Sequence, residues 1–98
     1  MNVLIVDDQI HVVNGIVNGV DWKALGISQT FTAYNAFEAR QLFSTQKIDI
    51  MVCDIEMPVE SGISLFRWVK SQNYPVECIF LTAHADFSYA QEAIRLGS

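Results

Sequence analysis

Four polar side chains stand directly after three apolar runs of the sequence. They are Asp7 and Asp8 after residues 3–6, Asp54 after residues 48–53, and Thr82 after residues 78–81. Continuous apolar runs of this length are typical of strands in a parallel sheet, which is covered on both faces. Because parallel strands end at the same edge of a sheet, we expect the four side chains to gather at one edge.

The chemistry of such a group is that of a cation and a phosphoryl group. Three carboxylates close together would repel one another and raise the pKa of at least one of them unless a cation is present. Oxygen-only ligands favour a hard ion, and Mg²⁺ with several retained waters suits two or three carboxylates. The hydroxyl of Thr82 could donate to a phosphoryl oxygen. Positioning and charge neutralisation are most of what phosphoryl transfer requires of a protein.

The elements that must position these groups are strands that alternate with helices. Residues 30–34 form a more polar, alternating run, which favours an edge strand. Apolar residues at helical spacing lie between the runs: Ile10, Val13, Val17 and Val20; Ala36, Ala39, Leu42 and Phe43; and Ala90, Ala93, Ile94 and Gly97. Asn35 followed by Glu38 has the pattern of a capping box at a helix start.

This alternation predicts an α/β fold with a doubly wound parallel sheet, because strand–helix–strand connections form right-handed crossovers. A strand order of 2-1-3-4 would put the switch point between the first and third strands. Ligands and reaction sites in such sheets lie at the carboxyl ends of the strands beside that point. The switch point would therefore lie where Asp8 and Asp54 are expected.

The composition favours a single cytoplasmic domain that binds no nucleic acid. The chain has 98 residues, of which 51% are hydrophobic, too many for a disordered chain. Its net charge of −5 repels nucleic-acid phosphates. No targeting signal is evident, and no apolar stretch approaches the roughly 20 residues that span a bilayer. Cys53 and Cys78 lie inside apolar runs, as buried reduced thiols of a cytosolic protein would.

The order and spacing of the motifs resemble the receiver domains of bacterial two-component response regulators. The resemblance rests on VLIVDD at residues 3–8, MVCDIEMP at residues 51–58, Gly62, and FLTA at residues 80–83. It implies a flavodoxin-like fold and a switch that takes a phosphoryl group from a sensor histidine kinase.

The same resemblance implies a role for each residue of the site. Asp54 would be the phosphoacceptor. Asp8 and Asp54 would bind Mg²⁺ directly, whereas Asp7 would act mostly through water. The backbone carbonyl of Glu56 would supply the third protein oxygen, and Thr82 would be the switch hydroxyl. A domain of this kind is a signalling module rather than an enzyme.

Two further segments resemble response regulators that carry an AraC-type DNA-binding output domain. They are VDWKALGI at residues 20–27 and AHADFSYA at residues 83–90. The resemblance implies that the output domain of the full-length protein contacts DNA, that the receiver domain itself does not, and that the protein forms a homodimer.

We expect residues 1–98 to form one receiver domain that stops before the family's fifth strand and helix. In the family, that strand carries an aromatic switch residue and ends in a lysine, followed by proline, that contacts the phosphoryl group. The sequence reaches Ser98 where this strand should begin. The fourth strand would then be an apolar sheet edge, which favours association.

Two other functions stay open on the sequence. One is a receiver-like module that works through protein contacts without phosphate, and the missing lysine is its only support. The other is an aspartyl phosphatase or related hydrolase, which would place an Asp-x-Asp pattern after the first strand. Gln9 follows Asp7 and Asp8, so that pattern is absent. Covalent labelling of Asp54 by a small phosphodonor would separate the three functions.

Overall fold

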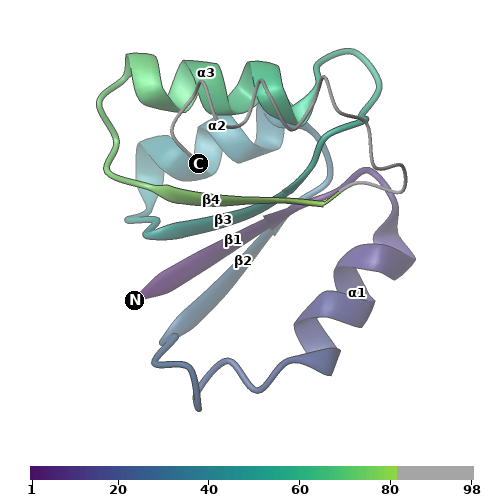
Figure 1. Cartoon of the computed structure of the whole chain (residues 1–98), viewed down its shortest axis with the longest axis vertical. Helices are drawn as coiled ribbons and strands as arrows, with labels where there is room; N and C mark the ends of the chain where they lie inside the picture. The colour runs from purple at the N-terminus through teal and green to yellow at the C-terminus, as the bar shows by residue number, and fades with distance from the viewer. Residues whose placement is uncertain (82–98) are drawn as a thin grey trace.

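The computed structural model describes residues 1–81, in which strands and helices alternate as predicted (Figure 1). In chain order, the elements are β1 (Asn2–Val6), α1 (Ile10–Gly19), β2 (Gln29–Ala33), α2 (Ala36–Thr45), β3 (Ile50–Asp54), α3 (Gly62–Ser71) and β4 (Glu77–Leu81). The helix expected over residues 90–97 lies outside the described residues. Within residues 1–81, no helix is both long and apolar enough to cross a membrane.

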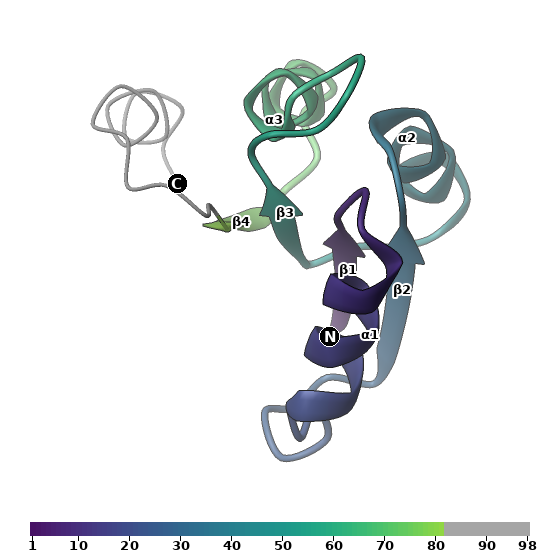
Figure 2. The ribbon, with the colours of Figure 1, turned by 90° about the vertical axis from the view of Figure 1, so that its right-hand side faces the viewer.

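The four strands are parallel and lie in the order β2-β1-β3-β4. Helix α1 covers one face of the sheet, and α2 and α3 cover the other (Figures 1 and 2). The predicted doubly wound sheet with strand order 2-1-3-4 is therefore confirmed. β2 lies at an edge of the sheet, as its polar alternation predicted.

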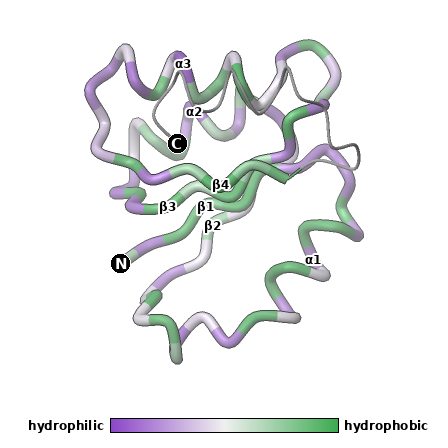
Figure 3. The backbone as a smooth tube through the Cα atoms, in the orientation of Figure 1, coloured by the Kyte–Doolittle hydropathy of each residue, from purple (hydrophilic) through white to green (hydrophobic). Residues whose placement is uncertain are grey.

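Strand β1 is buried on both faces, which explains its continuous apolar run. Leu4 and Val6 belong to the core cluster that packs against α2 and α3, whereas Val3 and Ile5 belong to the cluster that packs against α1. None of the four side chains has exposed surface. Burial of an aliphatic side chain of this size stabilises the fold by about 1.5–3 kcal/mol. Figure 3 shows the resulting hydrophobic stretch along the central strands.

Aromatic side chains pack α2 and α3 against each other and against β4. The ring centroid of Phe43 lies 6.2 Å from that of Trp68 and 5.4 Å from that of Tyr74. The rings of Phe66 and Phe80 meet edge to face at 5.7 Å. Such pairs contribute about 0.5–1.5 kcal/mol beyond the area they bury. They hold α3 against α2 and β4.

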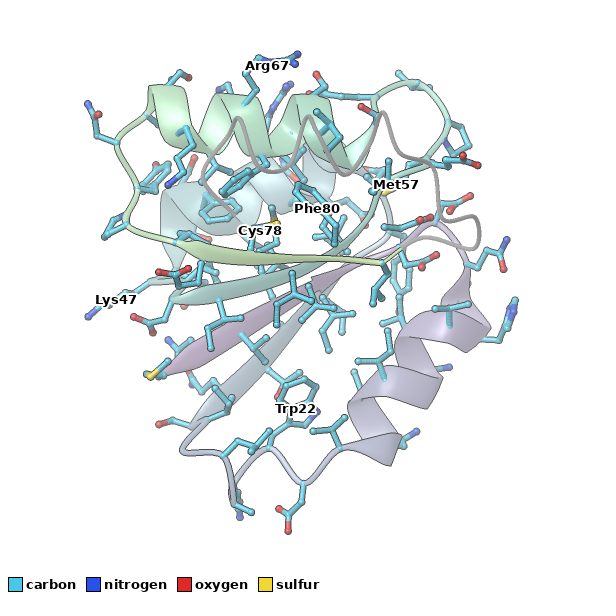
Figure 4. All side chains as sticks on the ribbon, viewed as in Figure 1. Trp22, Lys47, Met57, Arg67, Cys78 and Phe80 are labelled. Carbon is cyan, nitrogen blue, oxygen red and sulfur yellow. The ribbon has the colours of Figure 1, made fainter. Side chains whose placement is uncertain are left out.

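The two faces of the sheet also hold the thiols and the first tryptophan. Cys78 points toward the α3 side, and Trp22 lies on the α1 side, as Figure 4 shows. The indole of Trp22 donates a hydrogen bond to the Val17 carbonyl at 3.2 Å. Cys53 and Cys78 are buried and free, as predicted. Burial raises the pKa of both thiols, that of Cys78 to about 12, so neither is a thiolate at neutral pH.

The apolar stripe of α1 is narrower than its spacing predicts. Val13 is fully buried, and Ile16 and Val17 pack against the same cluster. Ile10 is 60% exposed and Val20 is 37% exposed, because they stand at the first position of the helix and at its C-cap. The helical spacing thus predicted the helix correctly, but only its middle residues are buried.

The start of α2 is capped by the predicted pair. The side-chain oxygen of Asn35 accepts the backbone N–H of Glu38 at 2.8 Å. The Glu38 carboxylate accepts the backbone N–H of Tyr34 at 2.8 Å. A capping box would return to the cap residue itself, so here the reciprocal bond is displaced by one residue. The pair still satisfies two backbone donors at the end of the sheet where α2 begins.

Candidate functional site

Three carboxylates gather at the carboxyl ends of β1 and β3. Oxygen atoms of Asp7, Asp8 and Asp54 all lie within 4.8 Å of one another. Val6 pairs with Cys53 in the parallel ladder, so the two strands deliver their acidic residues to the same point. Asp7 is buried, and Asp8 and Asp54 are half-buried. The predicted cluster at the switch point is therefore present.

The three carboxylates differ in the hydrogen bonds that they accept from the backbone. One oxygen of Asp7 accepts the backbone N–H of Gln9 at 2.9 Å and thereby shapes the turn into α1. One oxygen of Asp54 accepts the backbone N–H of Glu56 at 3.3 Å, a long hydrogen bond. Asp7 is thus the carboxylate most engaged by the backbone, which fits an indirect role toward a cation.

The surroundings of Asp54 disfavour its negative charge. Burial and, after it, the negative charges of Asp7 and Asp8 raise the pKa of its carboxyl; the hydrogen bond from the Glu56 N–H lowers it, and the net result is a pKa of about 6. A bound cation would reverse the effect of the neighbouring charges. All the donor atoms of the cluster are oxygens, which is the chemistry that Mg²⁺ prefers. The residues present therefore fit the magnesium site that the sequence predicted.

The loop after Asp54 is held close beneath it. Ile55 donates its backbone N–H to the Leu81 carbonyl at 3.1 Å, and the Ile55 carbonyl accepts the Gly62 N–H at 2.9 Å. A Cβ atom on Gly62 would lie only 2.1 Å from the backbone oxygen of Asp54. Any other residue at the first position of α3 would force the backbone around Asp54 or α3 to shift. The Glu56 side chain is exposed, as predicted, so its contribution to a site is that of its backbone.

Thr82, the fourth predicted site residue, lies outside the described residues, as does the segment of residues 83–90 that resembles AraC-type regulators. The end of β4 can nevertheless be placed, because Leu81 pairs with Asp54 in the ladder between β3 and β4. The residue directly before Thr82 is thus at the level of the predicted phosphoacceptor.

Beside the carboxylates is a cavity of about 530 Å³ that the sequence did not predict. It is lined by Asp8, Tyr34, Asn35, Ala36, Phe37, Arg40, Pro58, Val59 and Glu60. Its rim carries Phe37, which is 68% exposed, and Val59, which is fully exposed. The cavity lies between the start of α2 and the loop after β3, so only the packing of these two segments reveals it.

Comparison with known protein families identifies the family of this chain. The family of response regulator receiver domains matches residues 3–98. The chain is a response regulator receiver domain. The fold matches that of the chemotaxis protein CheY4 of Vibrio cholerae, which is 24% identical and superposes with a TM-score of 0.86 over 99% of this chain and 80% of that chain. Receiver domains are in general signalling modules, and they bind Mg²⁺ at an acidic pocket such as the one formed here.

Several relatives carry the receiver domain within longer transcriptional regulators. The chain is 30% identical to the transcriptional regulatory protein YesN of Bacillus subtilis over 95 residues, which are 97% of this chain and 26% of YesN. A response regulatory protein of Staphylococcus epidermidis is 28% identical, and the match covers 95% of this chain and 36% of that protein. The chain thus spans only about a quarter to a third of these curated relatives.

Solved structures show the same fold. The receiver domain of AraT, a response regulator from Geobacillus stearothermophilus, is 33% identical and superposes with a TM-score of 0.86 over 97% of this chain and 74% of that chain. A two-component transcriptional regulator AraC from Clostridium phytofermentans is 27% identical, with a TM-score of 0.89 over the same shares.

Proposed function

We propose that Asp54 is the residue that accepts a phosphoryl group from a sensor histidine kinase. The observation that carries this proposal is the meeting of Asp7, Asp8 and Asp54 at the switch point of a receiver domain. Asp54 is half-buried at the end of β3, where a carboxylate oxygen stays accessible to a donor. Burial and the neighbouring carboxylates oppose its negative charge, which a bound cation would offset.

In the proposed reaction, an oxygen of Asp54 attacks the phosphorus of a phosphohistidine. The new bond joins that oxygen to phosphorus, the phosphorus–nitrogen bond breaks, and the imidazole of the donor leaves. Bound Mg²⁺ would neutralise the charge that gathers on the phosphoryl oxygens. Asp8, Asp54 and the carbonyl of Glu56 would hold the ion, and Asp7 would orient its water ligands.

The phosphorylated domain would then act as a switch in a cytoplasmic transcriptional regulator. We assign the switch hydroxyl to Thr82, one residue beyond the end of β4. The relative YesN is named a transcriptional regulatory protein, and the solved regulator from Clostridium phytofermentans is named AraC, which together support a transcriptional output domain of the AraC type. We propose in addition that the full-length protein is a homodimer whose output domain binds DNA. In this proposed domain organisation, residues 1–98 belong to the receiver domain. The receiver domain acts on the output domain and does not itself catalyse a reaction on a small molecule.

The acceptor can be tested on the full-length protein with a small phosphodonor and Mg²⁺. Mass spectrometry of the intact wild type should show one added phosphoryl group, and Asp54→Asn should show none, because an amide cannot serve as the nucleophile. Undiminished labelling of Asp54→Asn would move the acceptor to Asp7 or Asp8. A folded wild type that takes no label would instead favour a receiver-like module that works by protein contacts alone.

A further inference from the structure

One charged contact ties helix α2 to the loop that follows Asp54. The guanidinium of Arg40, in α2, forms an ion pair and hydrogen bond with the carboxylate of Glu60, in that loop. The same Glu60 oxygen accepts the hydroxyl of Ser64 at 3.0 Å. The guanidinium carbon of Arg40 also lies 5.3 Å from the ring centroid of Trp68. We call Arg40, Glu60, Ser64 and Trp68 the Arg40 clamp.

The clamp differs from an ordinary surface ion pair in its burial and its number of contacts. Glu60 is 19% exposed and Arg40 is 37% exposed. Exposed ion pairs usually contribute little to stability because water screens them and both side chains lose freedom. Here the Trp68 ring contacts the guanidinium and the Ser64 hydroxyl donates to the carboxylate, so both charged groups have further contacts that restrict the geometry of the pair.

The loop that the clamp holds contains a strained turn. Val59 has a φ of 71°, in the left-handed region that a β-branched residue disfavours. The backbone N–H of Glu60 donates to the Pro58 carbonyl at 2.8 Å, which closes a three-residue turn around Val59. Val59 is fully exposed, so no packing of its own side chain maintains this conformation. The constraint must come from its neighbours, and Glu60 is the neighbour that the clamp fixes.

The same loop reaches the predicted phosphoacceptor. The backbone N–H of Glu56 donates to an Asp54 carboxylate oxygen, and Gly62 packs against the Asp54 backbone. The loop is thus anchored at both ends, and Glu60 holds the turn around Val59 just before α3. Because the loop is short, a change at Glu60 can reach the peptide groups next to Asp54.

We propose that Arg40 is a positioning residue for the phosphoacceptor site: through Glu60, it holds the loop of residues 55–61 in the conformation that serves Mg²⁺ binding. This inference rests on the proposed function of Asp54. Arg40 acts on the site only through Glu60 and not by contact with the cluster of Asp7, Asp8 and Asp54. Its effect is therefore on the affinity for the ion and on the order of the loop. The nucleophile itself is unchanged when Arg40 is replaced.

The test compares Arg40→Gln, Arg40→Lys and Lys47→Gln in the full-length protein. Arg40→Gln removes the charge of the clamp, Arg40→Lys keeps it, and Lys47→Gln removes a charge at the opposite end of the sheet (Figure 4). Loss of a residue that orients metal ligands typically weakens metal binding about 10- to 100-fold. We expect Arg40→Gln to raise the dissociation constant for Mg²⁺ about tenfold, by calorimetry, with Arg40→Lys between it and the wild type and Lys47→Gln unchanged.

A second readout needs no metal and no phosphodonor. In Mg²⁺-free protein, the amides of Glu56 and Glu60 should exchange with solvent faster in Arg40→Gln than in the wild type, whereas amides in β1 should exchange at the same rate. A variant that had merely lost global stability would speed exchange in β1 as well. At saturating Mg²⁺, the phosphorylation rate of Arg40→Gln should stay within about twofold of the wild-type rate, because Asp54 is intact.

Unchanged Mg²⁺ affinity in Arg40→Gln, or an equal loss in Lys47→Gln, would overturn the proposal. If Arg40→Gln does not fold, Glu60→Gln decides by the same criteria, because it keeps the shape of the side chain and its contact with Ser64. Failure of the proposed function looks different: the wild type would then take no phosphoryl group, and Asp54→Asn would bind Mg²⁺ like the wild type.

Discussion

The sequence predicts some of the groups that surround Asp54 but not all of them. The apolar run before it predicted a strand end, and the parallel sheet then required it to meet Asp7 and Asp8. That much follows from the sequence because strand ends of one sheet are a matter of topology. The engagement of Asp7 with the backbone of Gln9 does not follow, since it depends on the shape of one turn.

The raised pKa of Asp54 gives the Mg²⁺-free protein a defined pH dependence. Between the ordinary carboxyl pKa of 3.8 and the folded-state pKa of about 6, the folded protein binds more protons than the unfolded one. The free energy of unfolding should therefore fall as the pH rises through this window. Asp54→Asn lacks the titration, so the stability it gains over the wild type should be larger at pH 7 than at pH 4. Urea denaturation with a chelator measures this, and parallel pH profiles of the two proteins would contradict it.

The carboxylates of β1 should not be equivalent toward Mg²⁺. Asp8→Ala should weaken Mg²⁺ binding more than Asp7→Ala, because one Asp7 oxygen is already used by the Gln9 N–H. Tryptophan fluorescence or calorimetry at neutral pH measures both constants. Asp21→Ala, which removes an exposed carboxylate from the connection after α1, serves as the control. Wild-type affinity in Asp8→Ala would remove Asp8 from the site.

At the scale of elements, the connection from β3 to α3 decides the geometry of the site. The strands, their order and the helix α2 follow from apolar periodicity and the crossover rule, so the sequence predicted them. The Arg40 clamp could not be predicted, because Arg40 and Glu60 are distant in the chain and meet only after α2 and α3 have packed. The left-handed Val59 had no sequence signal, since valine is a residue that such turns avoid.

Two glycine substitutions should change stability in opposite directions. Gly62→Ala would push a methyl group into the backbone of Asp54 and should lower the free energy of unfolding by about 1–3 kcal/mol. Gly15→Ala, in the middle of α1 with no atom near the new methyl group, should raise it by about 0.5–1 kcal/mol. Denaturant titration of both variants gives the comparison. A neutral Gly62→Ala would mean that α3 can move away from Asp54 without cost.

At the scale of the whole molecule, the residues that stabilise the fold and the residues that could bind a cation occupy different parts of the sheet. The two core clusters lie on its faces, whereas the carboxylates lie at one end, where side chains are not needed to fill the core. The sequence predicted this division, because the apolar runs stop where the acidic residues begin. It did not show the cavity beside Asp8, whose walls come from segments on both sides of the switch point.

Mg²⁺ should therefore stabilise the entire fold and not only its site. An ion that binds the folded state alone raises the free energy of unfolding by about 1.4 kcal/mol when its free concentration is ten times the dissociation constant. Thermal unfolding with and without Mg²⁺, at constant ionic strength, should show this gain in the wild type. Asp8→Ala should lose most of it. A gain of equal size in both proteins would place the ion elsewhere.

The central position of β1 in the sheet has a consequence for folding during synthesis on the ribosome. β1 is made first, yet its neighbour β3 is complete only after Asp54, roughly 50 residues later, which a ribosome adds in about 2–10 s. Throughout that interval, the most apolar strand of the sheet has no partner on one side. Apolar surface that is exposed during synthesis favours association with other chains until the missing strand arrives. Synonymous codons that slow translation between β2 and β3 would lengthen this exposure without changing a single residue.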